Sequence, residues 1–202
     1  MLDKSLTYVP LMMTKTDTKN YPRFDLPEGY SFRFYRAGDE KDWVALECSI
    51  GQFDTEEAAL RMFRGEFIEN QILKPEERML FVVDPEGKAV ASASLWDGIL
   101  FGERRPRFHW VVVSDACTGK GIAKAMLSRI LDLYNELGYE GFLYLYTSTW
   151  SYQAIGIYKK LGFVPYLGEK NPFPYISDAD FLKNNATAWA AVDEKHSLYK
   201  KQ

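Results

Sequence analysis

Residues 111–124 read VVVSDACTGKGIAK. The valine run is typical of a strand covered on both faces, and the polar turn after it leads into a helix expected over residues 121–137. The backbone N–H groups of a first helical turn have no partners within the helix, and the helix dipole favours negative charge there. Gly119 and Gly121 remove side chains that would keep a phosphate away, and two lysines add positive charge. The stretch therefore predicts a site for a phosphate or pyrophosphate group.

The spacing of these residues excludes two common phosphate-binding loops. A Walker A loop requires G-x-x-x-x-G-K-[ST], but Ser114 stands where its first glycine should be, and Gly121 follows Lys120. A dinucleotide fingerprint requires G-x-G-x-x-G, and Lys124 occupies its last position. A glycine-rich helix start that binds nothing remains an alternative at this point.

Hydrophobic periodicity predicts further strands and helices on both sides of the loop. Strands are expected over residues 30–35, 79–84, 88–96, 107–113, 142–146 and 163–166, with a last strand over 188–192. Helices are expected over residues 39–50, 54–68, 121–137 and 152–161. This order predicts an α/β fold with a mixed, mostly antiparallel central sheet flanked by helices.

Length and composition indicate one domain preceded by a short arm. The chain has 202 residues, and no stretch is rich enough in Gly, Ser or Pro to separate two domains. Residues 21–202 are therefore expected to form a single domain. Residues 1–20 show little sustained pattern and are expected to be an N-terminal arm, either loose or packed elsewhere as a strand. The extension over residues 166–202 is a candidate interface for a homodimer.

Charge and cysteine content give no indication of several other classes. The net charge of -3 does not suggest a nucleic-acid or anionic-membrane partner. Cys48 and Cys117 lie far apart without a CxxC spacing, so they predict neither a disulfide framework nor a metal site. No apolar run approaches the roughly 20 residues of a membrane span, and the N-terminus lacks a signal-peptide pattern. We therefore expect a cytoplasmic protein with no bound metal and no nucleic-acid or membrane partner.

A second segment downstream carries a specific resemblance. Residues 151–163 read SYQAIGIYKKLGF and resemble the motif N-x-x-A-I-x-L-Y-x-K-L-G-F of the GNAT (Gcn5-related N-acetyltransferase) superfamily. Ser151 replaces the usual Asn and Ile157 the usual Leu. Residues 118–123, TGKGIA, likewise resemble the GNAT loop [QR]-x-x-G-x-[GA], with Thr118 in place of Gln or Arg. The similarity extends over roughly residues 30–166, which is most of the chain.

The resemblance implies a GNAT fold and an acetyl-CoA site. In that fold the strand before the loop splays from the next strand, and the pantetheine arm of acetyl-CoA pairs with strand backbone, here at Val111 and Val113. Ser151 is expected near the same arm. The pyrophosphate is expected on the backbone amides of the loop, which are those of Thr118, Gly119, Lys120, Gly121, Ile122 and Ala123. The implied activity is transfer of an acetyl or other acyl group from acetyl-CoA to a primary amine of a small molecule or peptide.

The implied reaction needs a proton donor and a base. Tyr158 occupies the motif position of a donor to the leaving thiolate, and a phenol with an ordinary pKa near ~10 suits that role. His109 is the candidate base because its ordinary pKa suits proton transfer near neutral pH. Asp97 and Glu103, near the start of the same strand, are alternatives. Strand alternation predicts that His109 and Trp110 face opposite sides. Five aromatic residues are candidates to line the acceptor pocket: Trp43, Phe53, Trp96, Trp110 and Trp150.

Two other functions remain open on the sequence. The first is a non-catalytic GNAT-like module that binds acyl-CoA as a sensor or as an interaction partner. The second is a protein that binds a nucleotide phosphate. Acyl-CoA turnover and ligand-dependent stabilisation distinguish these functions from an enzyme.

Overall fold

The structure is a computed structural model that describes residues 2–69 and 72–199. Residue 1 of the expected arm and residues 200–202 of the C-terminal extension lie outside the described residues. The chain divides into two compact units. Unit 1 comprises Tyr21–Trp96 and Phe108–Glu140, and unit 2 comprises Leu2–Asn20, Asp97–Arg107 and the chain from Gly141 onward.

Seven strands form an open sheet in the order β2-β3-β4-β5-β6-β1-β7. They are β1 (Pro10–Lys15), β2 (Ser31–Phe34), β3 (Met79–Val83), β4 (Ala89–Leu100), β5 (Glu103–Val113), β6 (Leu143–Ser148) and β7 (Val164–Pro165). The β2–β3, β3–β4, β1–β6 and β1–β7 pairs are antiparallel. This confirms the predicted α/β class with a mixed sheet and flanking helices.

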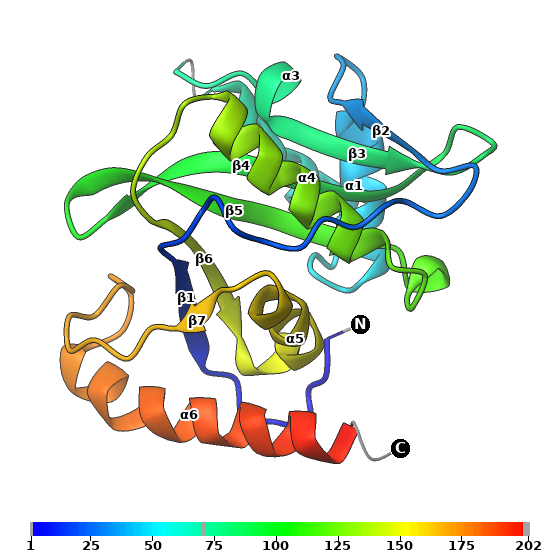
Figure 1. The fold of residues 1–202 in the computed structure, drawn as a ribbon. Coiled ribbons are helices and arrows are strands. Elements are labelled where there is room, and N and C mark those ends of the chain that lie inside the picture. Colours follow the sequence, from blue (N-terminus) through cyan, green and yellow to red (C-terminus); the bar gives the residue numbers. More distant parts are fainter. Residues whose placement is uncertain (1, 70–71, 200–202) are drawn as a thin grey trace. The chain divides into compact units, whose positions relative to one another are not determined.

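Unit 1 places helices on both faces of its strands (Figure 1). Its helical segments are α1 (Glu40–Ser49), α2 (Glu56–Phe63), the π-helical turn η1 (Arg64–Ile68), α3 (Pro75–Arg78), the short η2 (Asp115–Cys117) and α4 (Ile122–Glu136). Met79 and Phe81 on β3 join the buried cluster with α1 and α2. Alternation along the strand turns Leu80 and Val82 to the other face, where α4 contacts β3.

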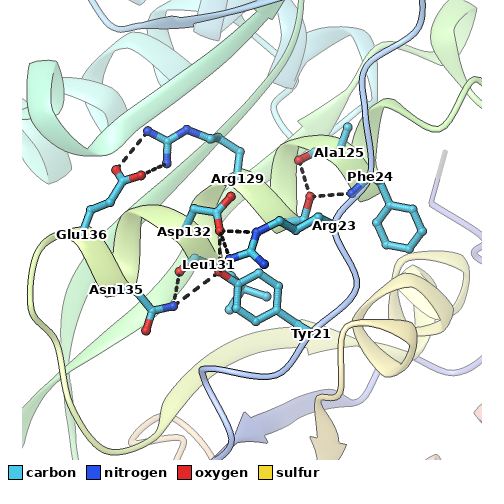
Figure 2. Close-up of polar contacts among 10 residues, drawn as sticks. Tyr21, Arg23, Phe24, Ala125, Arg129, Leu131, Asp132, Asn135 and Glu136 are labelled. Atoms are coloured by element: carbon cyan, nitrogen blue, oxygen red, sulfur yellow. Dashed lines mark hydrogen bonds and ion pairs between the residues drawn. The ribbon is translucent and has the colours of Figure 1, made fainter.

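Hydrogen bonds connect residues 21–24 to side chains of α4 (Figure 2). Tyr21 Oη and Arg23 Nε donate to Asp132 Oδ1 at 2.6 and 2.9 Å, and the Phe24 N–H donates to Ser128 Oγ at 3.3 Å. Asn135 Nδ2 donates to Tyr21 Oη at 3.4 Å. The segment is thereby held against the helix that begins at the predicted phosphate loop.

Unit 2 contains β1, β6 and β7 with α5 (Tyr152–Lys160), α6 (Asp178–Tyr199) and the short η3 (Thr149–Ser151). Strand β1 lies between β6 and β7, with Met12 opposite Tyr146 and Met13 opposite Pro165. The helix α6 contacts α5 and η3. Part of the expected N-terminal arm is therefore an interior strand of this unit.

Two expected elements differ from the structure. Residues 188–192 were predicted as a strand but lie inside α6. The buried residues Phe181, Ala188 and Val192 recur at helical spacing, and a short apolar run alone does not separate helix from strand. The β4–β5 hairpin also extends to residues 97–106, beyond the predicted strand ends. Within the part of the chain that the structure describes, no helix is both long and apolar enough to cross a membrane.

Candidate functional site

The phosphate loop of unit 1 depends on two left-handed glycines. Gly119 and Gly121 have φ angles of +82° and +85°, in the region that favours glycine. A Cβ added at either position would meet no heavy atom within 4 Å. Backbone conformation therefore requires these glycines, and the space beside them is not filled by the protein's side chains. A loop of this shape lets an anion approach the backbone closely.

Two amides of the loop already donate hydrogen bonds to nearby backbone carbonyls. The Thr118 N–H donates to the Asp115 carbonyl at 3.1 Å, and the Lys120 N–H to the Cys117 carbonyl at 3.4 Å. The helix α4 then begins at Ile122, with no side-chain cap and no acidic residue in its first turn. Amides of such a first turn have no intrahelical acceptor, so they are free to donate to an anion placed before the helix.

The two lysines at the loop each contact an aromatic side chain. Lys120 Nζ donates to Tyr30 Oη at 3.2 Å, and this hydrogen bond raises the pKa of Lys120 above its ordinary value. Lys124 Nζ lies 5.3 Å from the centre of the Phe24 ring. Cation–π contact of this kind restrains a lysine without neutralising it. Both positive charges therefore remain available beside the predicted anion site.

A hydrogen bond at the end of β5 indicates how the backbone of its last residues is oriented. The Ser114 N–H donates to the Val90 carbonyl of β4 at 2.8 Å. Successive residues of a strand direct their backbone groups to alternate edges. Val111 and Val113 therefore direct their N–H and C=O groups away from β4, while the side chain of Val112 is buried in the aromatic core.

A backbone irregularity in β5 overturns the predicted placement of His109 and Trp110. Trp110 has a φ of +48°, which is rare for a bulky residue and interrupts the alternation of the strand. The His109 ring lies 6.0 Å from that of Phe67, and the Trp110 ring lies 5.2 Å from that of Trp43. Since all four rings meet on one side, His109 and Trp110 share a face instead of opposing one another.

His109 has a carboxylate partner that the sequence did not reveal. His109 Nε2 lies 2.8 Å from Glu66 Oε1, and the two side chains are 15% and 27% exposed. Glu66 belongs to η1, and 43 positions separate it from His109 in the chain. No spacing motif connects two residues this far apart, so only the folded chain identifies the pair.

The aromatic residues of unit 1 are mainly core. Trp43 and Trp96 are fully buried, so the expectation that they line an acceptor pocket is wrong. Phe53, in the connection after α1, is partly buried and stacks on Trp110 with ring centres 5.7 Å apart.

Glu47 on α1 is also buried, and burial raises its pKa to about 8.

Unit 2 carries the second family-like segment. Tyr158 on α5 is 6% exposed, and burial raises its pKa well above the ordinary value, so the phenol keeps its proton at neutral pH. Ser151 ends η3 directly before α5, and its side chain caps no amide of that helix. Trp150 Nε1 donates to the Leu6 carbonyl at 2.8 Å, a structural contact. Asp97 lies 3.9 Å from Arg104 in an ion pair.

The predicted site residues are divided between the two units. Unit 1 holds His109, Val111, Val113 and the loop over residues 118–123, all on β5 or directly after it. Unit 2 holds Ser151 and Tyr158. Among residues 2–69 and 72–199, no group of three or more His, Cys, Asp or Glu side chains is arranged to hold a metal ion.

Comparison with known proteins gives a family match and several structures of similar fold. The model of the acetyltransferase (GNAT) family matches residues 30–163. No curated protein matches the chain. Among solved structures, a GCN5-related N-acetyltransferase from Sphaerobacter thermophilus is similar, with a TM-score of 0.60 and 25% identity, covering 78% of this chain and 48% of that one.

Two further structures show the same fold at lower identity. A GNAT-family acetyltransferase from Colwellia psychrerythraea has a TM-score of 0.58 and 16% identity, covering 80% of this chain and 55% of that one. The glucosamine-6-phosphate N-acetyltransferase of Arabidopsis thaliana has a TM-score of 0.50 and 17% identity, covering 72% of this chain and 98% of that one. The chain spans about half the length of the two bacterial proteins.

Proposed function

The chain belongs to the acetyltransferase (GNAT) family, and on this premise we propose that it transfers an acyl group from acetyl-CoA to a primary amine by direct attack. The observation that carries the proposal is the loop with its two left-handed glycines at the uncapped start of α4. A phosphate-binding shape at the position of the family's loop favours acyl-CoA over other donors. The acceptor is proposed to be a small-molecule or peptide amine.

The backbone supplies most of the proposed donor site. Amides of Gly119, Gly121, Ile122 and Ala123 are the candidates for the pyrophosphate, since the N–H groups of Thr118 and Lys120 donate to neighbouring carbonyls. The lysines of the loop add positive charge beside it. Val111 and Val113 are proposed to pair with the pantetheine arm, because their backbone groups point away from β4. Ser151 enters the proposal through its place in the family motif.

Two side chains are proposed to move protons. His109 accepts a proton from the amine nitrogen as the new N–C bond forms. Tyr158 gives its proton to the departing sulfur as the C–S bond breaks. Burial keeps the phenol protonated until that step, and the raised pKa makes it a weaker acid than a free phenol. The products are an amide and a free thiol, and both side chains return to their starting states by proton exchange with solvent. A strand amide near the thioester is the proposed stabiliser of the developing oxyanion.

A matched pair of glycine variants tests the donor site. Gly121→Ala places a methyl group in the loop, whereas Gly87→Ala introduces the same left-handed strain in the β3–β4 turn, also without a steric neighbour within 4 Å. We expect acetyl-CoA at ~100 times its Kd to stabilise the wild type and Gly87→Ala by about 2.7 kcal/mol, and Gly121→Ala far less. Thermal shifts measure this effect. Stabilisation of the wild type by ATP or NADH but not by acetyl-CoA would contradict the proposal.

An amine-panel screen with detection of released thiol tests catalysis. We expect the wild type to acetylate at least one amine, and Tyr158→Phe to bind acetyl-CoA normally while turning over more slowly. Removal of an acid or base group typically costs about 10²- to 10⁴-fold in rate. If the wild type binds acetyl-CoA and acetylates no amine, the chain is instead an acyl-CoA-binding module of the same fold.

A further inference from the structure

Two uncommon backbone conformations meet at the His109–Glu66 pair. Glu66 lies in a π-helical turn, closed by the bond from the Glu69 N–H to the Arg64 carbonyl at 2.9 Å. Next to His109, Trp110 adopts its left-handed φ of +48°. Both conformations are energetically unfavourable and occur frequently at functional sites. Their coincidence at one side-chain contact indicates that the fold maintains this contact in particular.

The surroundings restrict the imidazole ring. The rings of Phe67 and Trp110 lie 6.0 and 5.6 Å from the His109 ring, and Ser94 Oγ donates to the His109 carbonyl at 2.9 Å. With the side chain only 15% exposed, the carboxylate interaction is less screened than it would be at the surface. The geometry therefore favours one ring orientation.

We propose that Glu66 is a positioning residue for His109 in the acyl-transfer reaction, an inference that rests on the proposed function. An ionised carboxylate only accepts hydrogen bonds, so Nε2 of the neutral imidazole must carry its proton toward Glu66. The lone pair of His109 is then on Nδ1. A carboxylate that fixes the tautomer of a histidine base also stabilises the imidazolium formed when the base accepts a proton.

In the proposed step one proton moves from the amine to His109 and then to solvent. Nδ1 of His109 accepts one proton from the amine nitrogen, the ring becomes a cation beside the Glu66 carboxylate, and the proton later leaves Nδ1 for solvent. Glu66 itself gains and loses no proton. The carboxylate thus contributes through orientation and charge, without contact with the substrate.

Nuclear magnetic resonance tests the pair without any turnover. The chain contains two histidines, His109 and His196, so His196→Gln assigns the imidazole ¹⁵N signals. At a pH where the ring is neutral, we expect His109 to be protonated on Nε2 in the wild type. Glu66→Ala, which removes the acceptor, should shift or mix the tautomers, and Glu69→Ala, an exposed change of equal charge, should not. A wild-type ring protonated on Nδ1, or one unaltered by Glu66→Ala, overturns the proposal.

Kinetics then tests whether the fixed tautomer serves the reaction. With the amine that the wild type acetylates fastest, we expect Glu66→Gln to lower kcat by about 10²-fold or more, with the KM for acetyl-CoA unchanged. The double variant Glu66→Gln/His109→Gln should be no slower than His109→Gln alone, because Glu66 acts only through His109. Defects that multiply, or a raised KM with normal kcat, would show a structural role only. A wild type with no turnover defeats the proposed function, whereas the tautomer result stands separately.

Discussion

Glu47 is a buried acid whose titration should affect stability. The side chain is 2% exposed, and its Oε1 has no hydrogen-bond partner among the described residues. Burial raises its pKa to about 8 from the ordinary 4.5. Between these values the folded protein holds a proton that the unfolded chain releases, so the free energy of unfolding should fall as pH rises through this window. The amide introduced by Glu47→Gln cannot ionise, so this variant should lack that pH-dependent fall in the free energy of unfolding.

Denaturant midpoints across that pH window measure the effect. The wild type should lose stability relative to Glu47→Gln as the pH approaches about 8, and the difference should level off above it. Other carboxylates titrate in both proteins and cancel in the comparison. Parallel curves for the two proteins would mean that Glu47 ionises in the fold without cost.

The sequence predicts residues whose role depends on the local backbone, and it misses those defined by tertiary contact. Gly119 and Gly121 were predicted to lie at a phosphate site because a close backbone approach before a helix favours glycine. Glu66 was not predicted as a partner of His109, because nothing in its neighbours indicates a histidine 43 positions away. The prediction that His109 and Trp110 face opposite sides was wrong because the left-handed conformation of Trp110 interrupts the period of the strand.

The attachment of the 21–24 segment to α4 should contribute measurably to stability. Asp132 accepts from Tyr21 and Arg23, and burial, with the hydrogen bond to Asp132, raises the pKa of Tyr21 to about 12. Since Asp132 is 25% exposed and Tyr21 partly buried, we expect Asp132→Asn to cost about 1–2 kcal/mol. Denaturant unfolding measures the loss.

A second ion pair on the same helix provides the control. Arg129 and Glu136 form an ion pair along α4 (Figure 2). Arg129 Nη1 lies 3.0 Å from Glu136 Oε1, and the Glu136 side chain is 54% exposed. Exposed pairs of this kind contribute little, so Glu136→Gln should change stability by less than about 1 kcal/mol. Equal losses from Asp132→Asn and Glu136→Gln would show that the 21–24 segment is not held by Asp132.

Elements with strong periodic patterns were predicted well, and the errors have local causes. The helix after the loop and the strands β2 and β3 follow the prediction closely because their apolar positions are regular. The stretch 97–106, with its two glycines and the charged run 103–105, showed no regular strand pattern at the tip of the β4–β5 hairpin. There Phe101 and Gly102 both have positive φ, as a two-residue hairpin turn requires. The apolar run at 188–192 lacked the length that would have shown a helix.

At the scale of the molecule, unit 2 joins the two ends of the chain. Strand β1 pairs with β6 and β7, and Lys195 of α6 lies 3.2 Å from Asp3. The family-like segment 151–163 belongs to the same unit. Sequence patterns describe neighbours along the chain, so they could not show that residues 10–15 complete a sheet with strands more than a hundred positions later.

A single charge in β1 should therefore destabilise the protein, unlike a charge in a loose arm. Met12 is 1% exposed, packs with Tyr144 and Phe173, and accepts at its carbonyl from the Tyr166 N–H at 2.9 Å. Met12→Asp buries a carboxylate among these rings, and we expect a loss of more than about 3 kcal/mol in the free energy of unfolding. Thr16→Asp adds the same charge at an exposed position just after the strand and should change stability by no more than about 0.5 kcal/mol. Denaturant unfolding of both variants decides the matter, since small and equal losses would mean that residues 10–15 behave as a detachable arm.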